Sequence, residues 1–296
     1  MTAAARCRGA AVGLVLDRIV GEPPARVHPV VAFGRVMRRV EGALWSDSRW
    51  RGAAHAAIGS TLGVAAGSAF PTALATTVAV AGRQLADEAR AVSAALAAGD
   101  LDAARGILPA LVGRDVAELD EKDVARAAIE SVAENTVDAV VAPALWAAVA
   151  GGRGALGYRA VNTLDAMVGH RRPRYGRYGW ASARLDDVAG WVPARTTALL
   201  VAAVRPDAAP DVWRAVRRDA RAHPSPNAGV AEAAFAAALG LRLGGENRYA
   251  DRVELRPSLG DGRPPVASDV VAAVRLSGDV TWALAGALAV AGWWPR

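Results

Sequence analysis

The chain has 296 residues, a formal net charge of +6 from 35 basic and 29 acidic residues, and 53 % hydrophobic residues. This composition excludes intrinsic disorder, which needs low hydrophobicity and a high net charge. The single cysteine, Cys7, excludes an intramolecular disulfide framework and a cysteine-based zinc site. The length suits one large domain or two small ones, and an apolar content above that of a typical soluble domain raises the expectation of membrane-spanning helices.

The basic charge is almost entirely arginine, because Lys122 is the only lysine. The Glu-Lys-Asp sequence around it cannot supply a P-loop, and its charged surroundings argue against Schiff-base chemistry, including a pyridoxal-phosphate lysine. The arginines are scattered with few aromatic residues between them, so nucleic acid is not an expected partner.

The N-terminal segment Arg6–Val20 joins a basic start to a short apolar stretch, but no small-residue cleavage site follows it. We therefore expect a retained helix. A compact polar turn follows this helix and contains Asp17, Pro23, Pro24, His28 and Pro29.

The segment Gly52–Gly82 gives the strongest membrane signal. Apart from His55 it has no ionisable side chain over 31 residues, and a spanning helix needs roughly 20. Pro71 lies past its middle, so the segment is either one kinked span or a tight helical pair. The alternative to a membrane segment is a buried Ala-rich helix pair in a soluble bundle.

The next segment, Arg83–Asp123, has a different character. Leu85, Ala89, Val92 and Leu96 recur at helical spacing among charged residues, which indicates an amphipathic helix that faces water. A second helix is expected over Leu101–Leu111. We interpret residues 83–123 as a soluble helical insertion.

Four weaker apolar runs follow, each interrupted or shorter than a free-standing span: Ala139–Gly152, Ala155–Gly169, Val188–Val204 and Val280–Trp294. The Trp293-Trp294 pair is typical of an interfacial anchor. Arg205–Pro226 and Glu246–Pro265 are expected to be polar connectors, and no strand or hairpin pattern is evident. The prediction is therefore an all-α, polytopic helical membrane protein with a single domain over residues 1–296.

The first polar constellation consists of Glu130, Glu134 and Asp138. Their spacing of four residues places three carboxylates on one helix face, where like charges destabilise the helix unless cations lie opposite. A metal ion with phosphate, or a set of arginines, would compensate them. The alternative is a solvated face paired with Arg126 and other arginines.

Two further constellations lie near apolar helices. Arg159, Asn162 and Asp165 form a polar stripe at three-residue steps, either in a site or as an internal ion pair that orders the bundle. Asp186 and Asp187 together resemble a magnesium–phosphate device, although Asp187 as a helix N-cap is the simpler alternative.

The fourth constellation is the segment His223-Pro224-Ser225-Pro226-Asn227-Ala228-Gly229, with Glu232 close behind. Its two prolines fix a rigid turn, and its polar residues make an anion-friendly entrance to a helix. His223 is suited to acid–base work near neutral pH. An ordered loop with a helix cap explains the same residues without a function.

The chain resembles the CobD/CbiB family of cobalamin biosynthesis, the adenosylcobinamide-phosphate synthases. Seven motifs and a glycine segment carry this resemblance, and they follow one another in order over nearly the whole chain. The matching segments are residues 16–30, Val-Gly-Arg-Asp at 112–115, Glu-Ser-Val-Ala-Glu-Asn-Thr-Val-Asp at 130–138, residues 158–169, residues 180–187, Pro-Ala-Arg at 193–195, residues 223–229 and Gly240–Gly245.

The resemblance implies a multi-pass protein of the inner (cytoplasmic) cell membrane that acts as a carbon–nitrogen ligase. It implies adenosylcobyric acid and aminopropanol or aminopropanol phosphate as substrates, joined by an amide bond. Activation of the carboxylate would require ATP and Mg²⁺, with arginines in place of a P-loop lysine. The lipid bilayer and other corrin-pathway enzymes are the implied partners.

We assign roles on this basis. The expected catalytic residues are Glu130, Glu134, Asp138, Asp165 and Asp187. The expected Mg²⁺ ligands are Glu134, Asp138, Asp186 and Asp187. The expected substrate-binding residues are His28, Arg114, Asn135, Arg159, Asn162, Arg184, Arg195, His223, Asn227 and Glu232.

Two other functions fit the same residues. One is a membrane transporter or a scaffold for corrin-pathway enzymes, in which the buried charges serve passage or docking. The other is a helical prenyltransferase-like enzyme that binds diphosphate through Asp186 and Asp187. That enzyme class should carry a second Asp-rich motif of similar spacing, for which the Glu130–Asp138 run is a poor substitute.

Overall fold

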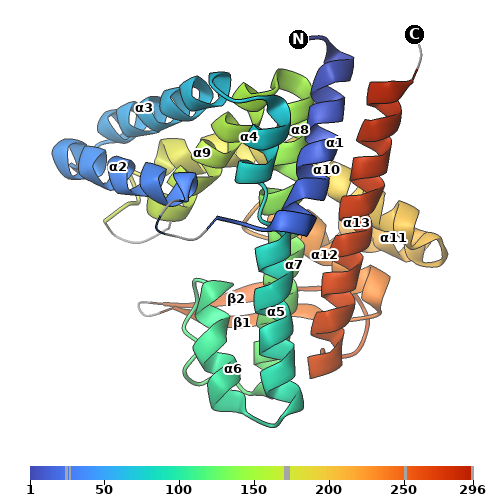
Figure 1. Ribbon diagram of the computed structural model, residues 1–296. Coiled ribbons are helices and arrows are strands. Elements are labelled where there is room, and N and C mark those ends of the chain that lie inside the picture. The colour runs from blue at the N-terminus through green and yellow to red at the C-terminus, as the bar shows by residue number, and fades with distance from the viewer. Residues whose placement is uncertain (24–25, 27, 170–173, 250–251, 295–296) are drawn as a thin grey trace. The chain divides into compact units, whose positions relative to one another are not determined.

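Helices form most of the protein, as expected from the sequence (Figure 1). The structure is a computed structural model that describes residues 1–23, 26, 28–169, 174–249 and 252–294. Its contacts divide the chain into two compact units: unit 1 comprises Met1–Ala81, Asp138–Pro193 and Leu284–Arg296, and unit 2 comprises Gly82–Val137 and Ala194–Ala283. The boundary between the units falls inside the helices α10 (Trp180–Val204) and α13 (Ala267–Trp293).

Unit 1 is built from helices that follow the predicted apolar segments. In addition to parts of α10 and α13 it contains α1 (Ala3–Val20), α2 (Pro29–Leu44), α3 (Arg49–Ser68), α4 (Thr72–Ala79), α8 (Ala142–Ala150) and α9 (Gly152–Val168). The first of these confirms the expected N-terminal helix. In the turn that follows, Pro24 lies outside the described residues, and His28 caps α2 by accepting a hydrogen bond from the Val30 amide at Nδ1, 3.1 Å.

Glycines allow α3 and α9 to pack backbone against backbone. A Cβ added to Gly67 would lie 2.1 Å from the carbonyl oxygen of Gly152, and one added to Gly63 would lie 2.7 Å from that of Leu156. Such close approach maximises dispersion contact between helices whose side chains are small. The Ala- and Gly-rich composition therefore produces a tight helix pair here.

The segment Gly52–Gly82 forms the tight helical pair that was one of the two predicted alternatives, and it does not form one kinked span. The chain leaves α3 at Ala69 and re-enters a helix after Pro71, which caps α4. Neither helix is long and apolar enough to span a membrane, because glycine, serine, His55 and the flanking arginines lower the apolarity of α3. Among the described residues, the helices that meet this condition are Glu121–Ala150 and Ala267–Trp293, which contain two of the runs judged weaker from the sequence.

Unit 2 begins with the predicted amphipathic helix. Arg83, Asp87 and Arg90 of α5 (Gly82–Ala97) are exposed, while the apolar residues Leu85, Ala89, Val92 and Leu96 are buried. The other helices of unit 2 are α6 (Leu101–Ile107), α7 (Glu121–Thr136), α11 (Ala209–Asp219) and α12 (Ala228–Leu239), with 3₁₀ turns at Leu108–Ala110, Pro206–Ala208 and Ala220–Ala222. The expected connector Arg205–Pro226 is thus partly helical, because Val212 and Ala215 bury one face of a charged segment.

The expectation that the chain contains no strands is wrong. The expected connector Glu246–Pro265 lies largely in an antiparallel hairpin of β1 (Leu243–Tyr249) and β2 (Arg252–Leu259), with a bulge between Leu243 and Gly245. Gly244 and Gly245 have φ of 84° and 103°, which glycine adopts readily. Since β1 has no alternating apolar pattern, its pairing depends on contacts with α7 that the sequence does not display.

We expect Gly67→Ala to destabilise the protein by about 1–3 kcal/mol, because the added methyl group would overlap the backbone of Gly152. Gly42→Ala, on an open face of α2, is the matched control and should stabilise by about 0.5–1 kcal/mol. Thermal unfolding of the purified variants measures both. Equal melting temperatures for the two variants would contradict this account of α3–α9 packing.

Candidate functional site

The aspartate cluster, Asp138, Asp165, Asp186 and Asp187, belongs to unit 1. The stripe Tyr158, Asn162 and Asp165 occupies one face of α9 at spacings of four and three residues. The Asn162 amide nitrogen donates to Asp138 Oδ2 at 3.3 Å and to Asp186 Oδ1 at 3.4 Å. One amide thus orients two carboxylates that would otherwise repel each other.

A π-helical turn, Val137–Val141, carries Asp138 between α7 and α8. Such a turn holds an extra residue, so it rotates Asp138 away from the direction that regular α-helical spacing predicts. There the Tyr158 hydroxyl donates to Asp138 Oδ1 at 3.4 Å. The expectation that Glu130, Glu134 and Asp138 share one helix face assumed an unbroken α-helix, and the π turn overturns that assumption.

Burial and mutual repulsion shift the ionisation of the aspartate cluster. Desolvation, followed by the charges of Asp138 and Asp165, raises the pKa of Asp186 well above its ordinary value. Burial and the nearby Asp187 raise the pKa of Asp165 to about 6. Asp165 therefore suits a proton acceptor near neutral pH. A hard divalent cation would relieve the same repulsion, so these oxygen ligands fit Mg²⁺.

Asp187 lies inside α10, seven residues after its first residue, Trp180, so the alternative that it is a helix N-cap is wrong. Its carboxylate forms an ion pair with Arg184 at 3.2 Å, in which the arginine side chain is 67 % exposed. An exposed pair of this kind contributes little stability. Arg184 therefore keeps its guanidinium accessible beside the aspartate cluster.

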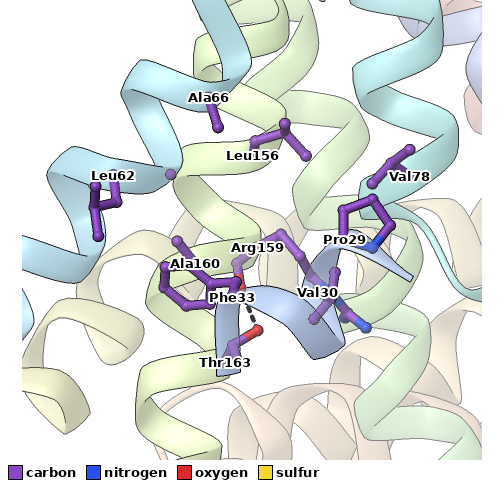
Figure 2. A pocket seen from close by; sticks show the side chains of 11 residues that line it. Pro29, Val30, Phe33, Leu62, Ala66, Val78, Leu156, Arg159, Ala160 and Thr163 are labelled. Atoms are coloured by element: carbon purple, nitrogen blue, oxygen red, sulfur yellow. Dashed lines mark hydrogen bonds between the residues drawn. The ribbon is translucent and has the colours of Figure 1, made fainter. Parts of the chain in front are cut away.

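Arg159 lines a pocket of about 80 Å³ in unit 1 together with apolar residues of α2, α3, α4 and α9, as Figure 2 shows. Its Nε is buried and donates no hydrogen bond to any of the described residues. His28, predicted to bind substrate, instead caps α2 and lies 3.1 Å from a Glu22 carboxylate oxygen. Of these two predicted residues, Arg159 is therefore the better placed to meet an anion.

In unit 2, Glu130 is the centre of a buried ion network. Its carboxylate pairs with Arg114 at 2.5 Å and with Arg126 at 3.3 Å, and it accepts the Gly244 amide at 2.9 Å. Both arginines also donate to Asn247 Oδ1, and Arg126 donates to the Glu246 carbonyl at 2.9 Å. This network fastens β1 to α7. It gives Glu130 and Arg114 a structural role, and their catalytic and substrate-binding roles stay predictions.

The glutamate–histidine cluster, Glu134, His223 and Glu232, also belongs to unit 2. One ligand atom from each lies within 4.8 Å of the other two, a spacing able to hold a metal ion. His223 Nε2 lies 3.4 Å from Glu232 Oε1 and 2.6 Å from a guanidinium nitrogen of Arg256. The three side chains therefore come from α7, the loop before α12 and α12 itself, and they meet in one buried polar cluster.

The predicted turn at residues 223–229 is both a helix cap and the support of this cluster. Ser225 Oγ accepts the amides of Asn227 at 3.3 Å and Ala228 at 3.2 Å at the start of α12. Gly229 packs against His223, whose Cβ lies 2.4 Å from where a Cβ of residue 229 would be. The Asn227 side chain accepts a hydrogen bond from Arg195 at 3.0 Å, which confirms that two predicted substrate-binding residues lie together.

In this cluster, the pKa values of Glu232 and His223 shift in opposite directions. Burial, followed by the charges of Glu134 and Glu130, raises the pKa of Glu232 well above its ordinary value. Burial, followed by the Arg256 charge, lowers the pKa of His223. Burial therefore favours the protonated form of Glu232 and the neutral form of His223.

The predicted residues thus separate into sets with different neighbours. Unit 1 contains Asp138, Asp165, Asp186, Asp187, Asn162 and Arg184. Unit 2 contains Glu134, His223, Glu232, Arg195 and Asn227. Asn135 bonds to the Ser131 carbonyl and hydroxyl of its own helix and joins neither set. Sequence reasoning missed Arg256 and Asn247, since both lie in the hairpin, and it gave no role to Tyr158 although the hydroxyl reaches Asp138.

The titration of Glu232 makes a testable contribution to stability. A carboxyl whose pKa is raised on folding loses stability as the pH rises from its unfolded value toward its folded value. Glu232→Gln, an isostere of the protonated acid, should remove this loss. In metal-free buffer, the melting temperature of the variant relative to the wild type should increase as the pH rises above 4.5, the ordinary pKa of a glutamate. Parallel pH profiles for the two proteins would show that Glu232 ionises normally.

His223 contributes with the opposite sign. Its lowered pKa means that the unfolded chain binds a proton below its ordinary value of 6.5 while the folded chain does not, so stability should fall as the pH drops through that value. Because Glu232 loses stability as the pH rises and His223 loses stability as the pH falls, the two contributions oppose each other.

Comparison with known proteins agrees with the resemblance seen in the motifs. The family model described as CobD/Cbib protein matches residues 10–277. The chain is 49 % identical over 286 residues to the cobalamin biosynthesis protein CobD of Mycobacterium tuberculosis, covering 92 % of this chain and 91 % of that protein. It is 43 % identical to the protein of the same name from Chromobacterium violaceum, covering 92 % of each. No solved structure matches the chain. The chain therefore belongs to the CobD/CbiB protein family.

Proposed function

We propose that this protein, which functions in cobalamin biosynthesis, is the ligase that attaches aminopropanol or aminopropanol phosphate to a carboxyl group of adenosylcobyric acid. The observation that carries the proposal is family membership over most of the chain. The retained polar motifs support it, because they gather into buried clusters of the kind that amide formation requires.

The amine has to be held and deprotonated before it attacks a carboxyl carbon. The aspartate cluster suits both tasks: its negative charge attracts an ammonium group, and Asp165, with a pKa of about 6, accepts the proton. Asn162 keeps Asp138 and Asp186 in place through hydrogen bonds. In this assignment Asp165 is the base and Asn162 is a positioning residue.

The carboxylate has to be activated, and ATP would supply that activation. Asp138, Asp186 and Asp187 would hold Mg²⁺, which neutralises phosphate charge when bound. Arg184 and Arg159 would bind anionic groups of the substrates, since arginine recognises phosphate and carboxylate through two parallel hydrogen bonds. Arg195, held by Asn227, would serve the same purpose in unit 2.

Incubation of purified protein with adenosylcobyric acid, aminopropanol phosphate, Mg²⁺ and ATP, followed by mass spectrometry, tests this proposal. We expect an amide product that disappears without ATP. Absence of amide with any nucleotide would overturn the proposal and favour transport or scaffolding.

Asp165→Asn should reduce the rate of amide formation by at least about 100-fold, because it removes the base. For the wild type we expect the rate to rise as the pH increases through about 6, where Asp165 loses its proton. Asp207→Asn, an exposed carboxylate outside both clusters, is the control and should keep the wild-type rate. An unchanged pH–rate profile in active Asp165→Asn protein would remove Asp165 from this role.

We also propose that the protein is a multi-pass membrane protein. Two helices, Glu121–Ala150 and Ala267–Trp293, are long and apolar enough to span a bilayer. Exposed large apolar side chains support the proposal, because unit 1 carries most of them, including Trp50, Val188 and Trp293. Among the described residues of unit 2 they are few: Leu199, Val253, Leu255, Val266 and Trp282. A surface so rich in apolar side chains is suited to lipid.

Membrane fractionation tests this assignment. The expressed protein should stay with the membranes after alkaline carbonate extraction and dissolve only in detergent, because a bilayer-spanning helix resists carbonate. Release into the carbonate supernatant would show a peripheral protein and would contradict the spanning assignment.

A further inference from the structure

The glutamate–histidine cluster brings three metal-ligating side chains together out of water. The His223 side chain is 1 % exposed and that of Glu232 is 5 % exposed. With Glu134 they present one imidazole nitrogen and two carboxylate oxygens within 4.8 Å of one another. Residues as far apart in the sequence as Glu134 and Glu232 supply this set, so the fold has to assemble it.

The imidazole of His223 is turned so that Nε2 faces the carboxylates. Its Nδ1 lies 3.1 Å from the Ser225 amide nitrogen and 3.2 Å from the Ser225 carbonyl oxygen, so the backbone of Ser225 fixes the orientation of the ring. Nε2 lies 2.6 Å from a guanidinium nitrogen of Arg256. Backbone support at one ring nitrogen, with the other nitrogen directed into the site, is the usual arrangement of metal-ligating histidines.

The charges of the cluster also call for a cation. The carboxyl oxygens of Glu134 and Glu232 lie within 4.8 Å of each other, and two negative charges this close repel unless a cation lies between them. Arg256, on β2, supplies part of the positive charge and also pairs with Glu254 at 3.1 Å. A divalent ion would compensate both carboxylates and would replace the arginine contact at Nε2.

We propose that Glu134, His223 and Glu232 bind a divalent transition metal that accepts imidazole, with Zn²⁺ as the best match. One nitrogen and two oxygen ligands suit Zn²⁺ and similar ions, whereas Mg²⁺ prefers oxygen ligands alone. The site is therefore chemically distinct from the all-oxygen aspartate cluster. It does not depend on the proposed ligase activity. In the metal-free protein, Arg256 occupies the position at Nε2 and moves aside when the ion binds.

Calorimetric titration of the full-length, metal-stripped protein with Zn²⁺ and with Mg²⁺ tests this site. We expect one Zn²⁺ site that His223→Gln and Glu232→Gln each weaken by at least about tenfold. Arg256→Gln should bind Zn²⁺ more tightly, because it removes a competitor for Nε2. Asp186→Asn and Asp207→Asn, outside the cluster, should leave Zn²⁺ affinity unchanged.

Absence of Zn²⁺ binding, or affinity that neither His223→Gln nor Glu232→Gln changes, would overturn the proposal. X-ray absorption on the Zn²⁺-loaded wild type keeps the test decisive if a variant fails to fold. The expected spectrum contains one imidazole and oxygen ligands. A spectrum with oxygen ligands alone would refute the site, whatever the outcome of the ligase assay.

Discussion

The buried carboxylate of Glu130 is the interaction on which the arrangement of unit 2 depends. An isolated buried charge is strongly unfavourable, so Glu130 needs the two arginines and the Gly244 amide that surround it. These partners come from the segment before α7, from α7 itself and from β1. The ion pairs and the hydrogen bond that compensate this carboxylate also hold the hairpin against α7. The hairpin in turn carries Arg256, whose guanidinium reaches His223, so the geometry of the glutamate–histidine cluster rests on the Glu130 network.

Unit 1 depends on a different constraint, the lack of side-chain volume. Ala-rich helices bury little apolar area per residue, and they gain contact only by close approach of their backbones. Glycines at 63 and 67 of α3 make that approach to α9 possible. A closely packed α9 holds Tyr158, Asn162 and Asp165 on one firm face, and Asn162 then sets the positions of Asp138 and Asp186. The small residues that give the sequence its unusual composition thus also position the aspartate cluster.

The two clusters differ in chemistry. The aspartate cluster offers oxygen ligands beside exposed or poorly partnered arginines, which suits a cationic amine, Mg²⁺ and anionic substrate groups. The glutamate–histidine cluster offers an imidazole beside two carboxyl groups, and its His223 and Glu232 side chains are buried. Residues that share one motif have different neighbours. Glu130 is held by two arginines, Glu134 belongs to the glutamate–histidine cluster, which the charge of Glu130 also reaches, and Asp138 belongs to the aspartate cluster. The Glu-x-x-x-Glu-x-x-x-Asp spacing therefore combines different roles along one helical run.

The sequence by itself determined the helical class, the amphipathic helix α5, the retained N-terminal helix and the family, because each depends on local periodicity or on the identity of motif residues. It also identified most side chains of both clusters, since polar residues beside apolar runs are conspicuous in a composition of this kind. Only the tertiary structure decided which of them meet. The hairpin is held by α7 through Glu130 and Arg126 and has no strand pattern of its own, so Arg256 and Asn247 could not be found in advance. The π turn at Asp138 breaks the helical spacing from which its direction was predicted. The hairpin depends on contacts between distant segments, of which the local sequence carries no physical record, and the π turn is a local departure from the regular helical spacing that the prediction assumed.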